Sequence, residues 1–284
     1  MIYYKKQSIF RTADIFYNHD EKPDKNVDVL SYYFVTERQK KCFGFQKHLT
    51  YLFDLSLEED ELFSRISKHT RQAINRAKNK DGIECVTLLE SGDYNINIVN
   101  DFINFYNNFA ELKKIAGVSM KDIEQFVTMK NICIRAAKKD DEILIMHQHQ
   151  ISDGRANGQR SCSLFRNSDD REYINLVSRA NRLLEWDTIV SFKQKGLLIY
   201  DLGGWYFGQT DKEQLSINEY KKYFGGEKRL EFIYTVPVSF LGYIYVFLRT
   251  IKHFIRYSKY VLARANALFF RKKPVNTTDS PAPI

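Results

Sequence analysis

The sequence predicts a mixed α/β fold in which a central sheet is flanked by helices. Short apolar runs of strand length alternate along the chain with longer segments of helical periodicity. A hairpin interrupts this alternation, because two strand-like runs flank the turn-forming stretch SDGRANG at 152–158. The 284 residues are 44% hydrophobic and 27% charged, which is typical of a globular chain with a sizeable core and excludes a disordered one.

The predicted elements begin after residue 40, because the first 40 residues are polar and irregular in pattern. Ser56 and Glu59 have the spacing of a capping box, which predicts a helix that Gly82 ends. The predicted elements are one or two strands at 42–55, that helix, a strand at 83–89, helices near 95–114 and 120–137, the hairpin, a long helix near 171–194, a strand at 197–201, a short helix near 214–223 and a strand at 229–235.

Charge and cysteine content constrain the function only loosely. The 43 Lys and Arg exceed the 35 Asp and Glu by a net +8, which suggests weak attraction to anions. The four cysteines form no C-x-x-C pair, and no secretory signal follows Met1, so we expect free thiols in a reducing compartment. His147 and His149 share one face of a strand, but no third ligand stands at a recognisable spacing, so no metal site is predicted.

A strand that ends on a carboxylate and two glycines is the strongest local signal. Asp201 closes an apolar run and is followed by Gly203 and Gly204, and a second pair, Gly225 and Gly226, comes one helix length later. Glycine pairs permit close approach of backbone to a ligand or a neighbouring strand, or a tight turn with positive φ. Both interpretations stay open on the glycines alone.

The stretch RANRLLEWDTIVSFKQKGLLIYDLGGW, followed by INEYKKYFGGE, resembles the FemAB-like branch of the GNAT acyltransferase superfamily. Upstream, FDLSLEEDELFSRISKHTRQAINRAKNKDGIE is similar to the entry strand and helix of the same family. The resemblance covers about residues 50–230 and implies a GNAT fold and transfer of an acyl or aminoacyl group to an amine. It also implies donors such as acyl-CoA or aminoacyl-tRNA, no permanently bound cofactor, and peptidoglycan precursors or amino sugars of surface polysaccharides as acceptors.

The resemblance implies that Lys221 stabilises charge on the reacting carbonyl group. Tyr220 stands where the family usually has Phe, and Leu202 replaces the usual Phe before the glycines. Peptidoglycan-modifying members carry two GNAT-like units, whereas this chain has room for one, which weakens the case for a lipid-linked peptidoglycan acceptor. The pyrophosphate-binding loop of acetyl-CoA enzymes is missing, since RANGQR at 155–160 lies in a hairpin rather than before a helix, so the donor stays open.

Attack of an amine on an ester or thioester needs positioning, a cation for the oxyanion and a path for one proton. We expect Lys221 to be the cation and Asp201 or His147 to take the proton. Arg71 either holds phosphates of a nucleotide-linked acceptor or of tRNA, or belongs to a solvated basic helix face. The other predicted substrate-binding residues are Asn181, Gly203, Gly204, Trp205 and Tyr220.

The C-terminal part differs from the rest, because residues 232–278 contain no acidic side chain. Apolar residues recur there with helical spacing, and basic residues lie mostly beside that stripe. The longest uncharged run is shorter than a spanning helix needs, so we expect a basic amphipathic helix on a membrane surface. The alternative is docking on the chain's own domain or on a partner. The predicted organisation is an irregular segment at 1–40, an acyltransferase domain at 41–236, the amphipathic helix at 237–272 and a disordered tail at 273–284.

These observations predict an acyltransferase acting at the cytoplasmic face of the cell membrane in assembly of surface polysaccharide or peptidoglycan. One alternative is an acetyl-CoA-dependent N-acetyltransferase acting on a nucleotide-linked amino sugar. Another is a non-catalytic adaptor whose basic C-terminal part binds membrane or nucleic acid. Lys221 separates the two classes, because an enzyme needs it and an adaptor does not.

Overall fold

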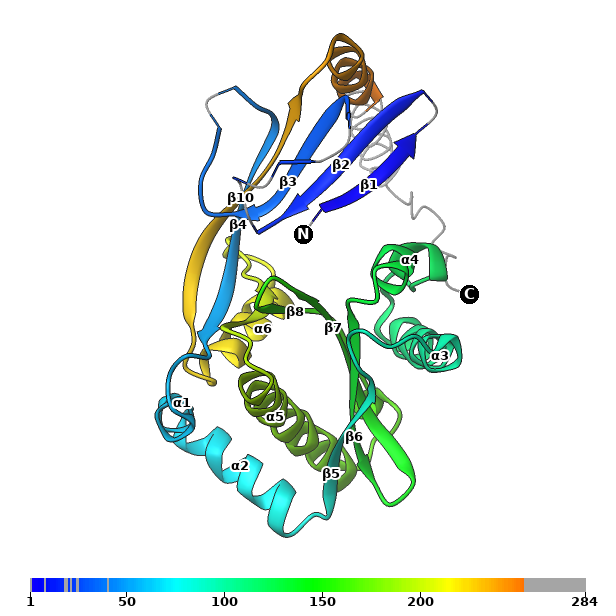
Figure 1. The fold of residues 1–284 in the computed structure, drawn as a ribbon. Helices are drawn as coiled ribbons and strands as arrows, with labels where there is room; N and C mark the ends of the chain where they lie inside the picture. The colour runs from blue at the N-terminus through cyan, green and yellow to red at the C-terminus, as the bar shows by residue number, and fades with distance from the viewer. Residues whose placement is uncertain are drawn as a thin grey trace, which may run out of the picture.

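A mixed sheet runs through the molecule from end to end in a computed structural model (Figure 1). The structure describes residues 2–7, 9–17, 20, 22–23, 26–39 and 41–252. Within them the strand order is β1-β2-β3-β10-β4-β9-β8-β7-β6-β5. The strands are β1 (Ile2–Gln7), β2 (Phe10–Phe16), β3 (Val29–Val35), β4 (Phe43–Asp54), β5 (Ile83–Leu89), β6 (Ile132–Lys139), β7 (Glu142–Ser152), β8 (Arg155–Ser163), β9 (Ile199–Gly204) and β10 (Glu227–Pro237). The helices are α1 (Glu59–Arg65), α2 (Lys68–Asn79), α3 (Ile96–Lys113), α4 (Met120–Thr128), α5 (Arg171–Gln194) and α6 (Lys212–Lys222), with a 3-10 turn at Leu164–Arg166 and a last helix at 240–252.

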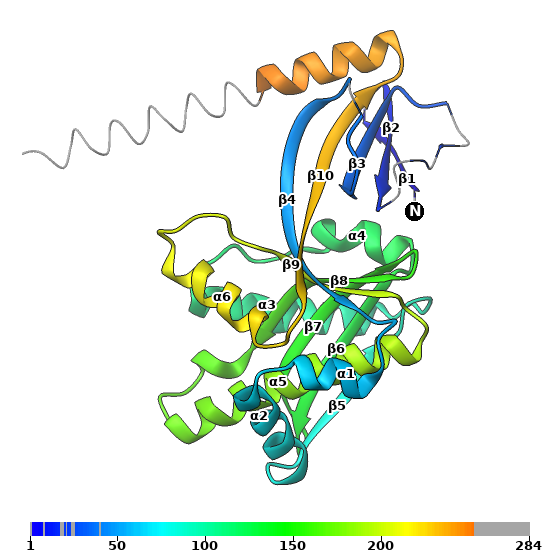
Figure 2. The same cartoon turned by 90° about the vertical axis from the view of Figure 1, so that its left-hand side faces the viewer.

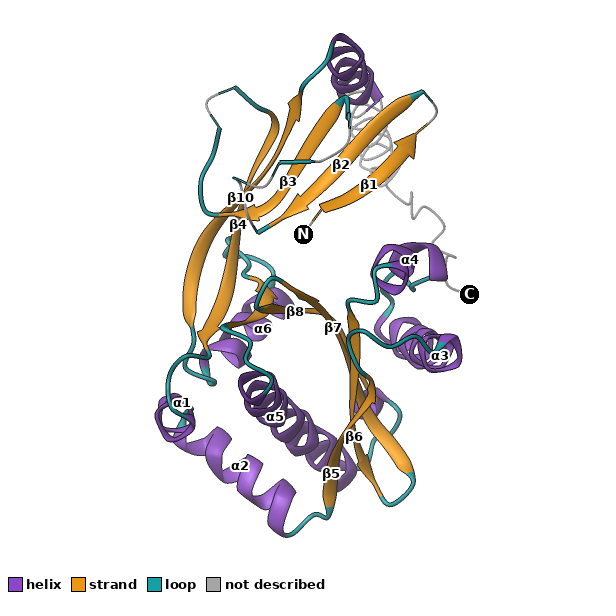
Figure 3. Cartoon of the chain, viewed as in Figure 1, coloured by secondary structure: helices purple, strands orange, loops and turns teal. Residues whose placement is uncertain are grey.

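Two long strands, β4 and β10, join a small N-terminal lobe to a larger lobe (Figure 2). The second half of β10 pairs with β3, and the first half pairs with the end of β4, next to β9. The N-terminal lobe is built mainly of strands, whereas the labelled helices gather around the larger lobe (Figure 3). The mixed α/β class with a central sheet and flanking helices is therefore confirmed.

Helices cover both faces of the larger lobe's sheet. Figure 1 shows α5 on one side of the sheet and α3 and α4 on the other. Leu184 and Phe192 of α5 belong to a core with Ile145 of β7, while Phe102 of α3 packs with Ile134 of β6 on the opposite face. A strand covered on both faces is apolar throughout and shows no alternation, which explains one error of the sequence prediction. The helix predicted at 120–137 is wrong in its second half, because α4 ends at Thr128 and β6 begins at Ile132.

Two further expectations for the first 82 residues are wrong. The segment 1–40 contains β1, β2 and β3 rather than irregular chain, because β3 finds its partner in the distant strand β10, which short-range patterns do not reveal. The helix expected from Ser56 to Gly82 is two helices, since extended backbone at Ile66 separates α1 from α2 and Ser67 caps α2. Ser56 donates to Asp54 instead of capping α1.

The C-terminal helix begins after Ser239, whose hydroxyl accepts from the backbone N–H of Gly242 and donates to Asp28 of the N-terminal lobe. The part of the amphipathic helix predicted beyond residue 252, and the tail at 273–284, lie outside the described residues. Within the described ranges no helix has the length and apolar character that crossing a bilayer requires. The domain boundaries at residues 41 and 236 stay a prediction.

Candidate active site

A cavity of about 490 Å³ lies where the parallel strands β8 and β9 separate. These strands pair only from Arg155 opposite Ile199 to Asn157 opposite Asp201. Beyond this point Gly158 to Ser161 of β8 line the cavity together with Leu202 of β9. The remaining walls come from β7, α3, α5 and α6. The space between two diverging strands, closed by helices, is a common position for a ligand site in an α/β protein.

Lys221 reaches this cavity from the last turn of α6 and is only 7% exposed. Its ammonium donates to the carbonyl oxygens of Gly203 at 3.0 Å and Gly204 at 2.6 Å. Burial lowers the pKa of Lys221, while the negative charges of Asp201 and Glu185 oppose that shift. The first glycine pair thus holds the predicted cation in place through its carbonyl groups.

Glu185, which the sequence analysis did not single out, is the second buried charge of the cavity. Its carboxyl group lies on α5, 4% exposed, and accepts a hydrogen bond from the hydroxyl of Tyr200. Burial raises the pKa of Glu185 to about 7, although the Tyr200 hydrogen bond and the charge of Lys221 act in the opposite direction. The available signal was an acidic residue between Leu184 and Trp186, within the apolar pattern of the long helix.

His147, Asn181 and Tyr220 form a hydrogen-bonded chain along the wall of the cavity. His147 Nε2 lies 2.9 Å from Asn181 Oδ1, and Asn181 Nδ2 donates to the Tyr220 hydroxyl at 2.9 Å. Burial lowers the pKa of His147 to about 4, so the ring is neutral at pH 7. Because Asn181 Oδ1 can only accept, Nε2 carries the proton and the unprotonated Nδ1 lies 3.9 Å from Glu185. The structure therefore brings these three predicted residues together beside Lys221.

Asp201 does not line the cavity, and its role as proton acceptor is corrected. The carboxylate is fully buried and accepts from Thr50, Arg155, Asn157 and the N–H of Gly203, the last at 2.8 Å. These four donors occupy the lone-pair positions that a carboxylate offers. Asp201 is instead the anchor of the turn that carries the glycine carbonyls.

The two glycines of the first pair differ in backbone conformation. Gly203 has a φ of +80°, and a Cβ there would lie 3.1 Å from the carbonyl oxygen of Gly158. Gly204 does not have a positive φ, and a Cβ there would lie 3.4 Å from the His48 ring. Gly203 thus combines both interpretations from the sequence, the tight turn and the close approach of a neighbouring strand.

Trp205 and Arg71 do not line this cavity, and their predicted substrate contacts stay a prediction. Trp205 is buried and stacks on Tyr51, with ring centroids 5.2 Å apart. Arg71 lies on α2 and donates to the carbonyl oxygen of Ser64 at 2.7 Å. The basic side chains that do line the cavity, besides Lys221, are Lys113 and Arg160. Lys113 forms an ion pair with Glu213 at 2.9 Å, and Arg160 donates to Gln148 at 3.0 Å.

The cysteines and histidines form no recognisable metal centre in the part of the chain that the structure describes. All four cysteines are free thiols, and within the described residues no three His, Cys, Asp or Glu side chains gather around a common point. The rings of His147 and His149 lie 6.0 Å apart, as expected from two residues on one strand face.

The comparisons with known proteins concern the fold. No protein-family model matches the sequence, and no curated protein matches it. Among solved structures, FemX is similar with a TM-score of 0.59 at 9% identity, over 82% of this chain and 83% of that chain. The C-terminal domain (DUF2156) of a putative lysylphosphatidylglycerol synthetase from Agrobacterium fabrum is similar with a TM-score of 0.51 at 12% identity, over 82% and 80%. The chain therefore shares the overall fold of FemX and of that domain, which agrees with the fold that the sequence resemblance implies.

Proposed function

We propose that this protein transfers an acyl or aminoacyl group from an activated ester or thioester to an amine of a cell-envelope precursor. The observation that carries the proposal is that a buried ammonium, Lys221, and a buried carboxyl group, Glu185, line one cavity. The donor is an acyl-CoA or an aminoacyl-tRNA. The acceptor is an amino sugar of a surface polysaccharide or a peptidoglycan precursor.

Lys221 stabilises the developing oxyanion in this mechanism. When the amine nitrogen attacks the donor carbonyl carbon, negative charge moves to the carbonyl oxygen. An ammonium has three N–H donors, and two of them are bound by Gly203 and Gly204. The glycine carbonyls fix the orientation of the remaining N–H, which donates to the oxyanion. The carbon–oxygen or carbon–sulfur bond of the donor then breaks, and its electron pair leaves with the oxygen or sulfur atom.

Glu185 takes the proton that the attacking nitrogen loses, directly or through one water molecule. A general base works best with a pKa near the working pH, and the value of about 7 meets this condition. The leaving oxygen or sulfur then recovers the proton from Glu185. His147, with a pKa of about 4, is a weak base and holds Asn181 and Tyr220 in position instead.

Phosphate groups on the donor or acceptor suit the two basic side chains of the cavity. Lys113 and Arg160 come from opposite elements, α3 and β8. CoA, tRNA and nucleotide-linked sugars all carry phosphates, which form charge-assisted hydrogen bonds with such groups. One structural neighbour is named for making lysylphosphatidylglycerol, a lipid that carries an aminoacyl group, and this supports an envelope acceptor.

The test incubates purified protein with acetyl-CoA or charged tRNA and amino-sugar nucleotides, and follows the products by mass spectrometry. Lys221→Met should lower turnover by about 10²–10³, because the charge is lost while the length of the side chain is kept. The variant should also melt earlier than the native protein, because two glycine carbonyls lose their donor. Native turnover in the variant would refute the role of Lys221. No product from any donor, with membrane binding intact, would favour the adaptor.

A further inference from the structure

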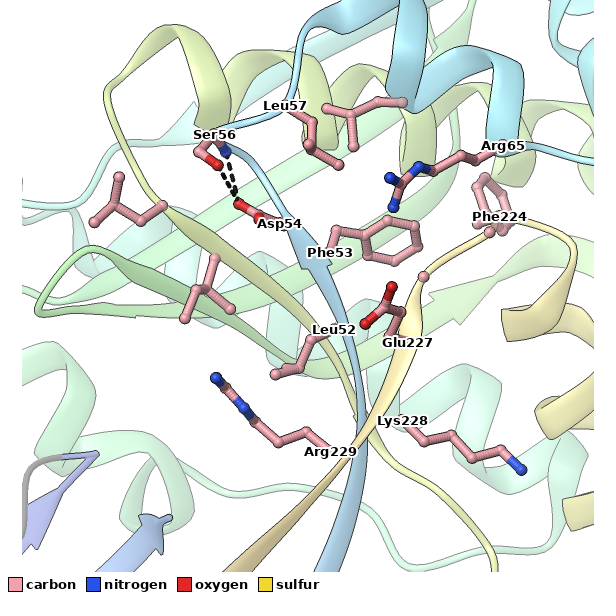
Figure 4. A pocket seen from close by; sticks show the side chains of 15 residues that line it. Leu52, Phe53, Asp54, Ser56, Leu57, Arg65, Phe224, Glu227, Lys228 and Arg229 are labelled. Carbon is pink, nitrogen blue, oxygen red and sulfur yellow. Dashed lines mark hydrogen bonds between the residues drawn. The ribbon is translucent and has the colours of Figure 1, made fainter.

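A second cavity, of about 520 Å³, opens where the connection after α6 returns to the sheet (Figure 4). Its walls come from the end of β4, the starts of β9 and β10, and α1. It shares no lining residue with the cavity that holds Lys221 and Glu185. An inference about its ligand therefore does not rest on the proposed function.

The second glycine pair shapes this cavity by bringing three elements together. Gly225 has a φ of +78°, and a Cβ there would lie 2.4 Å from the carbonyl oxygen of Arg65 at the end of α1. A Cβ on Gly226 would lie 2.5 Å from the carbonyl oxygen of Leu52 on β4. Only glycine permits such approach of two backbones. The pair thus allows the start of β10 to pack closely against α1 and β4, and the cavity lies between these three elements.

Apolar side chains form most of the cavity wall. They include Leu52, Phe53, Leu57, Leu62 and Phe224. Leu198 stands at the edge, 61% exposed, and also lines the hollow. Apolar surface in a concave site favours a ligand with an apolar body.

Charged side chains of both signs point into the same hollow. In Figure 4, Arg65 and Glu227 approach from opposite walls, and Arg229 lies on the other side of Leu52. The side chains of Glu227 and Arg229 form no hydrogen bond or ion pair with any residue of the described ranges, although both residues pair with β4 through their backbones. Asp54 is different, because its carboxylate accepts from the Ser56 N–H at 3.0 Å and hydroxyl at 2.6 Å. Arg65 forms an ion pair with Glu61 at 2.7 Å, and Lys228 lies over the Trp205 ring. The charges available to a ligand are therefore the carboxylate of Glu227 and the guanidinium of Arg229.

We infer that this cavity binds a zwitterionic apolar ligand, namely an amino acid or short peptide with a free amino group and a free carboxylate. The ligand carboxylate bonds to Arg229, where a guanidinium offers paired donors. The ligand ammonium meets Glu227, and apolar side chains cover Leu52 and Leu198. With one carboxylate and one guanidinium free to bind, the cavity matches a ligand that carries both charges better than a phosphate dianion, which Glu227 repels, or a simple cation, which Arg229 repels.

The test is calorimetric titration of the full-length protein with leucyl-leucine, its N-acetyl derivative and its C-terminal amide. The free dipeptide should bind, and each blocked form should bind about fivefold more weakly, as expected for one partly exposed charge pair. Glu227→Gln should remove the preference for the free amino group, and Arg229→Gln the preference for the free carboxylate. Arg171→Gln changes an exposed arginine that lines neither cavity and should leave all three affinities unchanged.

Absence of binding, or equal binding of the three forms, overturns the inference. Tighter binding of inorganic pyrophosphate than of the dipeptide also overturns it. Leucine methyl spectra locate the ligand independently: the dipeptide should shift Leu52 and Leu198, and a shift confined to Leu202 in the other cavity contradicts the assignment. Acyl transfer is measured separately, so failure of either proposal leaves the other standing.

Discussion

At the scale of single residues, Glu185 gives the most specific prediction of how the reaction rate depends on pH. The amine donates its proton only to an ionised carboxylate, so kcat/KM should rise with pH until about 7 and then level off. Glu185→Gln should lower the rate by about 10²–10⁴ and remove this limb of the profile. Measuring kcat/KM from pH 5 to 9 for both proteins checks this. An unchanged limb in the variant would assign the titration to the amine substrate instead.

The free energy of unfolding should also depend on Glu185, but it should fall with rising pH, whereas kcat/KM rises. Between the ordinary Glu value of 4.5 and about 7, folded Glu185 holds a proton that the unfolded chain has released. The free energy of unfolding therefore falls as pH rises through this window and stays level above it. Compared with Glu185→Gln, the native protein should lose on the order of 3 kcal/mol between pH 4.5 and 8. Denaturant titrations at both pH values measure this, and parallel curves for the two proteins would contradict it.

The first glycine pair offers a matched comparison of two neighbours. Gly203→Ala should lower stability by about 1–2 kcal/mol, because its φ is +80°. Gly204→Ala should cost clearly less, since its φ is ordinary and the new methyl group only touches the His48 ring. Thermal unfolding of both variants measures the difference. Equal losses would mean that backbone conformation is not what requires glycine here.

Lys221 and Glu185 show how far sequence could reach at this scale. Lys221 was predicted because it stands in a motif with the spacing of a known family. Glu185 lies among apolar residues of α5. Which face of that helix is buried depends on packing against the sheet, and Tyr200, the partner of Glu185, is a strand residue fifteen positions later. Asp201 was misassigned because its partners Thr50 and Arg155 come from other strands that only the fold brings near.

At the scale of elements, the helix at 240–252 has two different faces. Its inner face packs on the N-terminal lobe, where a Cβ on Gly242 would lie only 1.9 Å from the Asp28 carbonyl oxygen and Tyr245 contacts Phe10. On the outer face Phe240 is 80% exposed and Phe247 64% exposed. Docking therefore leaves much of the apolar stripe uncovered, which supports the proposal that this helix lies on a membrane surface.

We expect the full-length protein to float with vesicles containing phosphatidylglycerol and to detach at high salt. Arg249 and Lys252 are exposed beside the apolar face, and each contributes about 1 kcal/mol near an anionic surface. The double variant Phe240→Ser, Phe247→Ser should lose binding without disturbing the docked face. Truncation after residue 238 should also lose it. Loss in the truncated chain alone would place the membrane contact beyond residue 252, and no flotation at all would refute the membrane proposal.

Long helices with one buried and one exposed face were the easiest elements to predict. The boundaries of α5 agree with the predicted 171–194, because apolar residues recur there over many turns. β6 was misread as helix since its sequence, ICIRAAKK, contains good helix formers and is buried on both faces in its first six residues. β3 was missed because it pairs with the distant strand β10, which local pattern does not record. β1 and β2 form a local hairpin, with Gln7 opposite Phe10, and the prediction missed it because the segment looked polar and irregular.

At the scale of the whole molecule, the two lobes should unfold as one unit. β4 and β10 run through both lobes, and the Tyr17 ring of the N-terminal lobe lies 4.4 Å from the guanidinium of Arg155. Arg155 in turn pairs with Glu231 of β10 at 2.6 Å and with Asp201. Calorimetry should show a single transition whose van't Hoff and calorimetric enthalpies agree.

The variant Arg155→Met tests more strictly whether the two lobes unfold as one unit. It leaves the buried carboxylates of Asp201 and Glu231 without their cation, which costs about 3–5 kcal/mol. If the lobes are one cooperative unit, the single transition moves to lower temperature without splitting. Two separate transitions, in the native protein or in the variant, would mean that the lobes unfold independently.

Because β4 lies between β9 and β10 in the sheet, its pairing is delayed during protein synthesis. β4 leaves the ribosome early, but both strands that pair with it are made only after residue 198. At about 5–20 residues per second, β4 waits roughly 7–30 s with both edges unpaired. Unpaired strand edges bind other chains. Nascent copies of this protein should therefore depend on chaperones until residue 237 has emerged, and chains released earlier should aggregate.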